Sequence, residues 1–213
     1  MPRQLIGIVG RAGAGKTTAA EYLVKRYGFT RLSYAAPIKN IAKHYFGVTQ
    51  EEITNKGHDA RRILQSLGEL LIGIDPDWLI KCMIGSILDT DGDIVIDDIR
   101  RENEAELLRM NGGTIVRLVC QGAPEILTDE QKAHTTEKGS DNIQEDIAIT
   151  EAYGNLEGLR HHMDNLAAFI TPSQIKTIAW KPTPEEGAED AEETGAGSAG
   201  SEGTATDPEE RRI

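Results

Sequence analysis

The stretch that decides the fold is Gly7-Ile8-Val9-Gly10-Arg11-Ala12-Gly13-Ala14-Gly15-Lys16-Thr17-Thr18. It places the pattern GxxxxGK[ST] after an apolar run that starts at Leu5 and before a helical pattern from Thr17 to Arg26. Glycines let backbone N–H groups approach phosphate oxygens, and the positive end of the following helix attracts the same anion. The stretch therefore predicts a strand, a phosphate-binding loop and a helix. A glycine-rich turn that contains Gly-Lys-Thr by chance would not need the strand and helix around it.

The loop also predicts which residues hold a nucleotide. Lys16 is expected to reach the β- and γ-phosphates, and the Thr17 hydroxyl is expected to bind Mg²⁺. The whole set expected to bind ATP is Arg11, Ala12, Gly13, Ala14, Gly15, Lys16, Thr17 and Thr18.

Composition divides the 213 residues into two parts. The formal net charge is −12, and residues 182–213 contribute −8 of it through ten acidic residues and two arginines. This segment has one large aliphatic residue, Ile213, so it has too little apolar surface to offset the entropy of ordering. We expect one domain over residues 1–181 and a disordered acidic tail over residues 182–213.

The same composition limits the partners. The acidic charge argues against a surface that coats nucleic acid, and no apolar run approaches the roughly 20 residues of a membrane span. The two cysteines, Cys82 and Cys120, and the absence of a signal-like N-terminus predict a reduced, cytoplasmic location.

Further periodic segments predict an α/β fold with a mainly parallel sheet. Residues 49–60 are polar and are expected to form a connection without a helix, and residues 121–142 are expected to form a flap that closes over the nucleotides. The other expected strands cover residues 29–34, 94–96, 114–119 and 146–150, and the other expected helices cover residues 38–46, 61–72, 77–88, 102–110 and 156–169.

Polar residues at two places suggest a second part of the site. Asp97-Asp98-Ile99-Arg100 follows the buried run 94–96, and ligands of parallel sheets lie at the carboxyl ends of strands. Either aspartate is suited to hold Mg²⁺ through water, and Arg100 is suited to bind phosphate. In the helix that follows residue 60, Arg61 and Gln65 share a polar face one turn apart. The alternatives are a helix-capping aspartate with a surface arginine, and a solvated helix face.

Taken in order, these segments resemble the phage-type deoxynucleoside monophosphate kinases, which have the P-loop nucleoside monophosphate kinase fold. The resemblance covers residues 4 to about 170. It rests on GRAGAGKT at residues 10–17, SYAAPIK at 33–39, RRILQSLG at 61–68, Asp77-Trp78, Asp98-Ile99-Arg100 with Asn103-Glu104-Ala105, and His134-Thr135-Thr136-Glu137.

The resemblance implies a three-layer fold with a central five-stranded sheet, and transfer of the ATP γ-phosphoryl group to a deoxynucleoside monophosphate. It implies Lys16, Arg61, Asp98 and Arg100 as catalytic residues and Thr17 and Asp98 as metal ligands. The residues that it implies for the monophosphate are Arg61, Gln65, Trp78, Asp98, Arg100 and Lys138. A phage-encoded protein of this kind is expected in the host cytoplasm. The resemblance leaves open whether the protein forms a homodimer.

Two other functions remain open at this point. One is a small-molecule kinase of the same fold with an alcohol acceptor, similar to dephospho-coenzyme A kinase, for which Asp98 would serve as the base. The other is a regulatory module that hydrolyses ATP slowly as a switch. Arg117 or Lys138 is the candidate for closing over the phosphates, because the flap contains no arginine.

Overall fold

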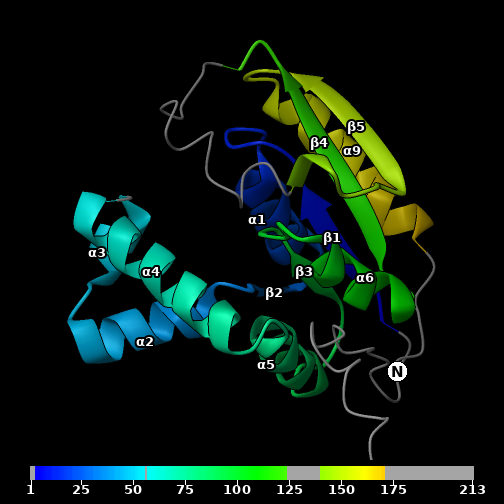
Figure 1. Cartoon of the computed structure of the whole chain (residues 1–213). Coiled ribbons are helices and arrows are strands. Elements are labelled where there is room, and N and C mark those ends of the chain that lie inside the picture. Colours follow the sequence, from blue (N-terminus) through cyan, green and yellow to red (C-terminus); the bar gives the residue numbers. More distant parts are fainter. Residues whose placement is uncertain (1–2, 56, 124–139, 171–213) are drawn as a thin grey trace, which may run out of the picture. The chain divides into compact units, whose positions relative to one another are not determined.

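The computed structural model of the chain describes residues 3–55, 57–123 and 140–170. Its centre is a five-stranded sheet in the order β2-β3-β1-β4-β5, in which every pairing is parallel (Figure 1). The strands are β1 (Leu5–Val9), β2 (Thr30–Leu32), β3 (Ile94–Ile96), β4 (Thr114–Gln121) and β5 (Ile147–Ala152). The expected parallel five-stranded sheet is confirmed.

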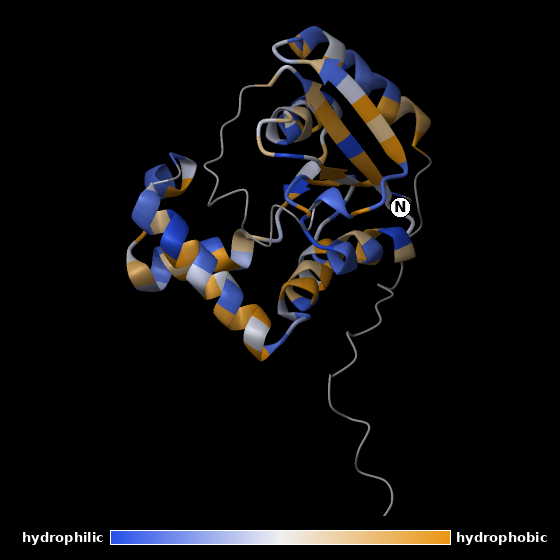
Figure 2. Ribbon diagram, turned by 45° about the horizontal axis from the view of Figure 1, so that its top comes forward, coloured by the Kyte–Doolittle hydropathy of each residue, from blue (hydrophilic) through white to orange (hydrophobic). Residues whose placement is uncertain are grey.

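Helices cover both faces of this sheet, which explains why β1 and β3 are buried along their whole length. One core cluster joins Leu5, Ile94 and Ile115 to α5 (Trp78–Leu88) and α6 (Glu102–Met110). The other joins Ile6 and Ile8 to α1 (Lys16–Tyr27) and α9 (Leu156–Phe169). Figure 2 shows orange, apolar segments in the strands and also along parts of the helices. The three-layer prediction is therefore correct.

A further group of helices lies beside the sheet. It contains α2 (Ala36–Phe46), α3 (Gln50–Thr54) and α4 (His58–Ile74), and α2 and α4 lie side by side (Figure 1). Ala42, Val48 and Ala60 form a small core between them, with Leu64 and Leu67 packed against it. Because α2 follows β2 directly, this group starts from the carboxyl edge of the sheet.

One expectation about this helical group was wrong. The segment 49–60 is not free of helix, because Thr49 and Glu52 form a capping box that starts α3, and α4 begins at His58. Within α4, Leu70 is 59% exposed, whereas Ile72 packs against the core.

The remaining helix predictions agree closely with the structure. The helices expected at 102–110 and 156–169 have those bounds in α6 and α9, and α5 differs from its expected range by one residue. Strand β5 lies one residue later at its start and two later at its end than expected. No helix within the described residues is long and apolar enough to cross a membrane. Residues 124–139 of the expected flap and the whole expected tail lie outside the described residues.

Candidate active site

The loop between β1 and α1 has the backbone that its glycines permit. Gly10, Gly13 and Gly15 have φ angles of 141°, 82° and 88°, a region that other residues rarely adopt. A Cβ atom on Gly10 would also lie 2.4 Å from the carbonyl oxygen of Leu118 on β4. The loop is therefore packed tightly against the sheet at one end and opens into the first turn of α1 at the other.

Lys16 is the first residue of α1, and its side chain bends back over this loop. The ammonium Nζ donates to the carbonyl oxygens of Gly10 at 2.6 Å and Arg11 at 2.9 Å. These contacts place a positive charge over the loop that the sequence predicts to bind phosphate. Arg11 itself points to Asp141, with 3.2 Å between Nη2 and Oδ2, and its side chain is 82% exposed.

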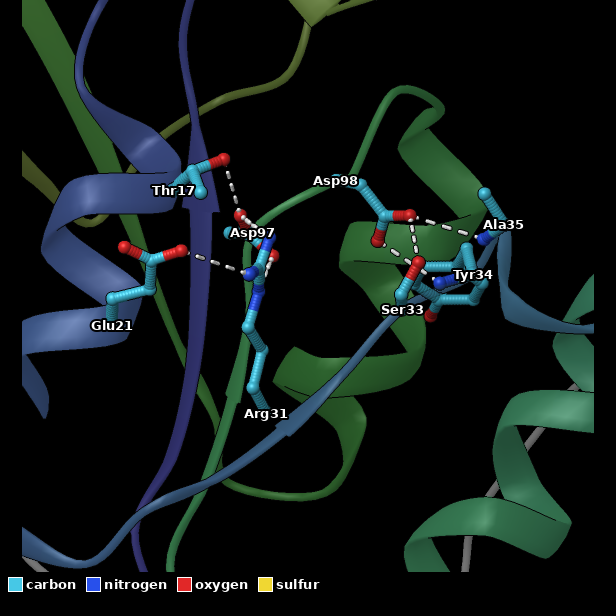
Figure 3. A network of polar contacts seen from close by, with 8 residues as sticks. All are labelled: Thr17, Glu21, Arg31, Ser33, Tyr34, Ala35, Asp97 and Asp98. Carbon is cyan, nitrogen blue, oxygen red and sulfur yellow. Dashed lines mark hydrogen bonds and ion pairs between the residues drawn. The ribbon is translucent and has the colours of Figure 1, made fainter. Parts of the chain in front are cut away.

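Thr17 contacts Asp97 rather than Asp98 (Figure 3). The Thr17 hydroxyl donates to Oδ2 of Asp97 at 3.1 Å, and the Asp97 side chain is only 3% exposed. Arg31 of β2 donates to the same carboxylate through Nε at 2.8 Å and Nη2 at 2.7 Å. The sequence predicted Thr17 and Asp98 as the metal ligands. In the structure, the carboxylate next to Thr17 is that of Asp97.

Asp98 turns away from α1 toward the loop that joins β2 to α2. Its carboxylate accepts the Ser33 hydroxyl at 2.5 Å and the backbone N–H groups of Tyr34 at 2.9 Å and Ala35 at 3.0 Å. Figure 3 shows these three contacts on the side of Asp98 that faces away from Thr17. Asp98 therefore ties the end of β3 to the start of α2, and its roles at the metal and the acceptor remain predictions.

The segment that carries Arg100 is held by a buried acid. Glu104 is 4% exposed, and its Oε2 accepts the backbone N–H groups of Arg100 at 2.8 Å and Arg101 at 3.2 Å. Burial raises the pKa of Glu104 from 4.5 to about 7, against the opposing effect of these hydrogen bonds. The buried Tyr34 hydroxyl donates to the Glu104 carbonyl at 2.9 Å, so the segment is also joined to the loop that Asp98 holds.

Arg117 is engaged with the chain itself. Its guanidinium donates to Glu145 at 2.8 Å, to the carbonyl oxygen of Ser140 at 3.2 Å and to that of Ile143. The bond from Arg117 is the main cause that lowers the pKa of Glu145. These contacts favour a structural role for Arg117 over closing across the phosphates.

Three of the predicted acceptor residues, Arg61, Gln65 and Trp78, lie on α4 and at the start of α5. Arg61 and Gln65 are half-buried on α4, and Trp78, the first residue of α5, packs against the core. That these residues form one site with Lys16 and Arg100 remains a prediction. Lys138, His134 and Glu137 lie outside the described residues.

A cavity of about 290 Å³ adjoins the loop on the side opposite to Asp97, and no motif quoted above indicates it. Its walls come from the loop and α1, the end of β4 and the turn between β5 and α9. They include Gly13, Gly15, Thr18, Val119, Tyr153 and Asn155. The turn at Tyr153-Gly154-Asn155 was a detectable signal, because it follows a strand at the same carboxyl edge.

Comparison with known proteins adds independent evidence. The family model for deoxynucleotide monophosphate kinases matches residues 46–163. A protein of Acanthamoeba polyphaga mimivirus, named "Putative deoxynucleotide monophosphate kinase", is 30% identical in an alignment 155 residues long, which covers 59% of this chain and 77% of that protein. Human adenylate kinase isoenzyme 5 is 25% identical in an alignment 189 residues long, which covers 86% of this chain and 31% of that longer protein.

Among solved structures, TT1252 from Thermus thermophilus is similar in fold. It has a TM-score of 0.50 and 15% identity, and the match covers 80% of this chain and 100% of that one. The identity is low, so this likeness concerns the fold alone. The family model spans more than half of the chain, and the viral relative is matched over most of its length, so this chain is a kinase that belongs to the deoxynucleotide monophosphate kinase family.

Proposed function

We propose that this kinase transfers the γ-phosphoryl group of ATP to the 5′-phosphate of a deoxynucleoside monophosphate and forms ADP and a deoxynucleoside diphosphate. The observation that carries the proposal is the Lys16 ammonium above the glycine loop, directly beside the Thr17–Asp97 pair at the carboxyl edge of the sheet. Family membership supplies the acceptor class.

The residues at this edge fit the phosphates and the metal. The glycine loop exposes backbone N–H groups to an anion, and Lys16 supplies a point charge beside them. Thr17 and Asp97 are oxygen ligands of the kind that Mg²⁺ prefers, with Asp97 acting through water. When bound, Mg²⁺ would neutralise charge on the phosphate oxygens.

The cavity beside the loop is suited to the base of the donor nucleotide. It adjoins Gly13 and Thr18, which lie at the phosphate end, and extends to the partly apolar turn at Tyr153. A base that enters it would stack on apolar and aromatic groups while its phosphates stay at the loop. We assign this cavity to the ATP base.

The acceptor is assigned to the other side of the loop, toward α4 and Arg100. Its phosphate oxygen is already anionic, so the reaction needs positioning and charge neutralisation more than a protein base. Arg61 and Arg100 would bind the monophosphate, and Gln65 and Trp78 would contact the nucleoside. Lys138 remains a candidate contact from the flap. The two free cysteines support a cytoplasmic location for this activity.

The alternative with an alcohol acceptor needs an available carboxylate base. Asp98 was the candidate, and both of its oxygens already accept hydrogen bonds from the loop at Ser33–Ala35. An ATPase switch would need no acceptor site at all. Neither alternative accounts for the match to the family model over α4 and α6.

The acceptor panel that tests this proposal contains the four deoxynucleoside monophosphates, the matching ribonucleotides and a set of alcohols that includes dephospho-coenzyme A. Each is incubated with ATP, Mg²⁺ and the full chain, and the products are separated by ion-exchange chromatography. We expect a diphosphate from at least one deoxynucleotide. Phosphorylation of an alcohol with no diphosphate from any nucleotide would overturn the proposal.

A further inference from the structure

Asp97 is a buried carboxylate that a neighbouring arginine contacts through two hydrogen bonds. With its side chain 3% exposed, an ionised carboxylate is costly unless charged hydrogen-bond donors surround it. Arg31 provides a two-pronged contact, from Nε to Oδ1 at 2.8 Å and from Nη2 to Oδ2 at 2.7 Å. Such a fork fixes the plane of the carboxylate, which a single donor would leave free to rotate.

The strand register explains how Arg31 reaches this carboxylate. Arg31 pairs with Val95 of β3, and Val95 belongs to the core cluster beneath α1. Side chains on one face of a strand recur every second residue, so Asp97 follows Val95 on the α1 side of the sheet. Figure 3 shows Arg31 rising from β2 along this side to Asp97, between the sheet and α1.

The hydroxyl of Thr17 is the group that this arrangement orients. A hydroxyl has one proton and two lone pairs, and Thr17 gives its proton to Oδ2 of Asp97 at 3.1 Å. Its lone pairs are then directed away from Asp97 and are available to a cation. The direction of the hydroxyl depends on where Oδ2 lies, and Arg31 determines the position of Oδ2.

We propose that Arg31 is a positioning residue of the metal site, which acts through Asp97 to hold the Thr17 hydroxyl in the orientation that binds Mg²⁺ with the nucleotide. The proposal rests on the ATP and Mg²⁺ site described above. It assigns Arg31 no contact with the nucleotide or the metal.

Two effects of Arg31 on the metal have opposite signs. Its positive charge disfavours a nearby cation, whereas its fork orients the ligands that bind that cation. Arg31→Lys separates them, because lysine keeps the charge but has no planar fork for two carboxylate oxygens. Arg31→Met removes both. If orientation is the main contribution, both variants lose the benefit of Mg²⁺.

The experiment measures ADP binding to the full chain by calorimetry, once with Mg²⁺ and once with EDTA, and takes the ratio of the two dissociation constants. We expect Mg²⁺ to tighten ADP binding to the wild-type chain. Arg31→Lys should reduce this tightening by about tenfold or more, the scale found for residues that orient metal ligands. ADP affinity in EDTA should stay close to the wild-type value, because the loop and Lys16 are unchanged.

Two further comparisons distinguish positioning from a general loss of stability. Glu21 also lies near Arg31, at 3.7 Å from Nη1, so Glu21→Gln removes a neighbouring ion pair and should leave the ratio unchanged. In an Asp97→Asn background, Arg31→Lys should have no further effect, since two residues that act through one contact are not additive. Additive losses, or a normal ratio in Arg31→Lys, would overturn the proposal.

The assay contains no acceptor. A wrong acceptor class would appear in the acceptor panel and leave these ratios as expected, whereas a wrong role for Arg31 would appear only here. If Arg31→Met fails to fold, Arg31→Lys alone still gives the ratio, and its thermal midpoint is recorded with the same samples.

Discussion

The hydroxyl oxygen of Thr17 lies 3.1 Å from Oδ2 of Asp97, while the neighbouring Asp98 accepts three hydrogen bonds from Ser33, Tyr34 and Ala35. Two adjacent aspartates therefore serve different elements. Asp97 contacts Thr17 at the start of α1, next to the phosphate loop, and Asp98 contacts the residues that precede α2.

Because the two aspartates contact different elements, we predict different phenotypes for their asparagine variants. Asp97→Asn should lower kcat by about 100-fold, the upper part of the range for a residue that orients a metal ligand, and should raise the Mg²⁺ concentration for half-maximal rate. Asp98→Asn replaces an acceptor of two backbone N–H groups, so it should lower the free energy of unfolding by about 1–3 kcal/mol. Steady-state kinetics and urea denaturation of both variants check this. A normal Mg²⁺ dependence in Asp97→Asn, combined with a lost one in Asp98→Asn, would reverse the assignment.

Arg61 and Arg62 are adjacent arginines on α4 with different predicted roles. Arg61 is half-buried, whereas the Arg62 side chain is 73% exposed beside Asp59. If Arg61 binds the acceptor phosphate, Arg61→Ala should raise the KM for the monophosphate by about tenfold or more, the loss expected for a charged hydrogen bond of about 1.5–3 kcal/mol. The KM for ATP should change little. Arg62→Ala is the matched control, and equal acceptor kinetics in the two variants would remove Arg61 from the site.

Glu104 predicts a pH dependence of stability. Its folded-state pKa of about 7 lies above the ordinary value of 4.5, so the native state binds a proton more tightly than the unfolded state does. The resulting stabilisation is complete below about pH 4.5 and is lost as the pH rises through about 7. At about 1.4 kcal/mol per pH unit, the loss is about 3 kcal/mol.

Glu104→Gln removes this ionisation and keeps an oxygen acceptor for the N–H groups of Arg100 and Arg101. Urea denaturation at pH 5 and pH 8 should therefore show the wild-type chain losing more stability than the variant between these two pH values. Glu102→Gln changes an exposed acid in the same helix and serves as the control. Parallel pH profiles for wild type and Glu104→Gln would contradict the buried titration.

The acidic segment 182–213 is predicted to be dispensable, because its composition offers almost no apolar surface to pack on the kinase domain. A chain that ends at residue 181 should keep its activity and its thermal midpoint. Kinetics and differential scanning calorimetry compare the two chains. A large drop in either quantity would show that the segment contributes to the folded enzyme.

Much of the fold follows from local sequence signals. The bounds of α6 were predictable because Asn111-Gly112-Gly113 ends an amphipathic run, and Gly112 has a φ of 72° there. Strand β3 was predictable because three consecutive apolar residues follow a turn at Asp91-Gly92-Asp93. Helix α3 was missed because its five residues carry no apolar periodicity, although Thr49 and Glu52 have the spacing of a capping box.

The site was predictable only in part, for a physical reason. The glycine loop, Lys16 and Thr17 are contiguous in the chain, so one motif contains them. Which of Asp97 and Asp98 lies next to Thr17 depends on the face of the sheet to which each side chain points. The contact from Arg31 to Asp97 depends on the register between β2 and β3. The strand register and the face to which each side chain points are set by packing against α1. A local sequence pattern does not predict that packing.

The central claim is that the phosphoryl group which leaves ATP arrives on a deoxynucleoside monophosphate, with Lys16 stabilising the transfer. The most direct measurement is ³¹P NMR of one reaction that contains ATP, Mg²⁺, the full chain and the best acceptor of the panel. We predict that ADP and deoxynucleoside diphosphate accumulate in equal amounts, and that Lys16→Ala abolishes both products while its thermal midpoint stays normal. Formation of ADP and inorganic phosphate without the diphosphate would contradict the account.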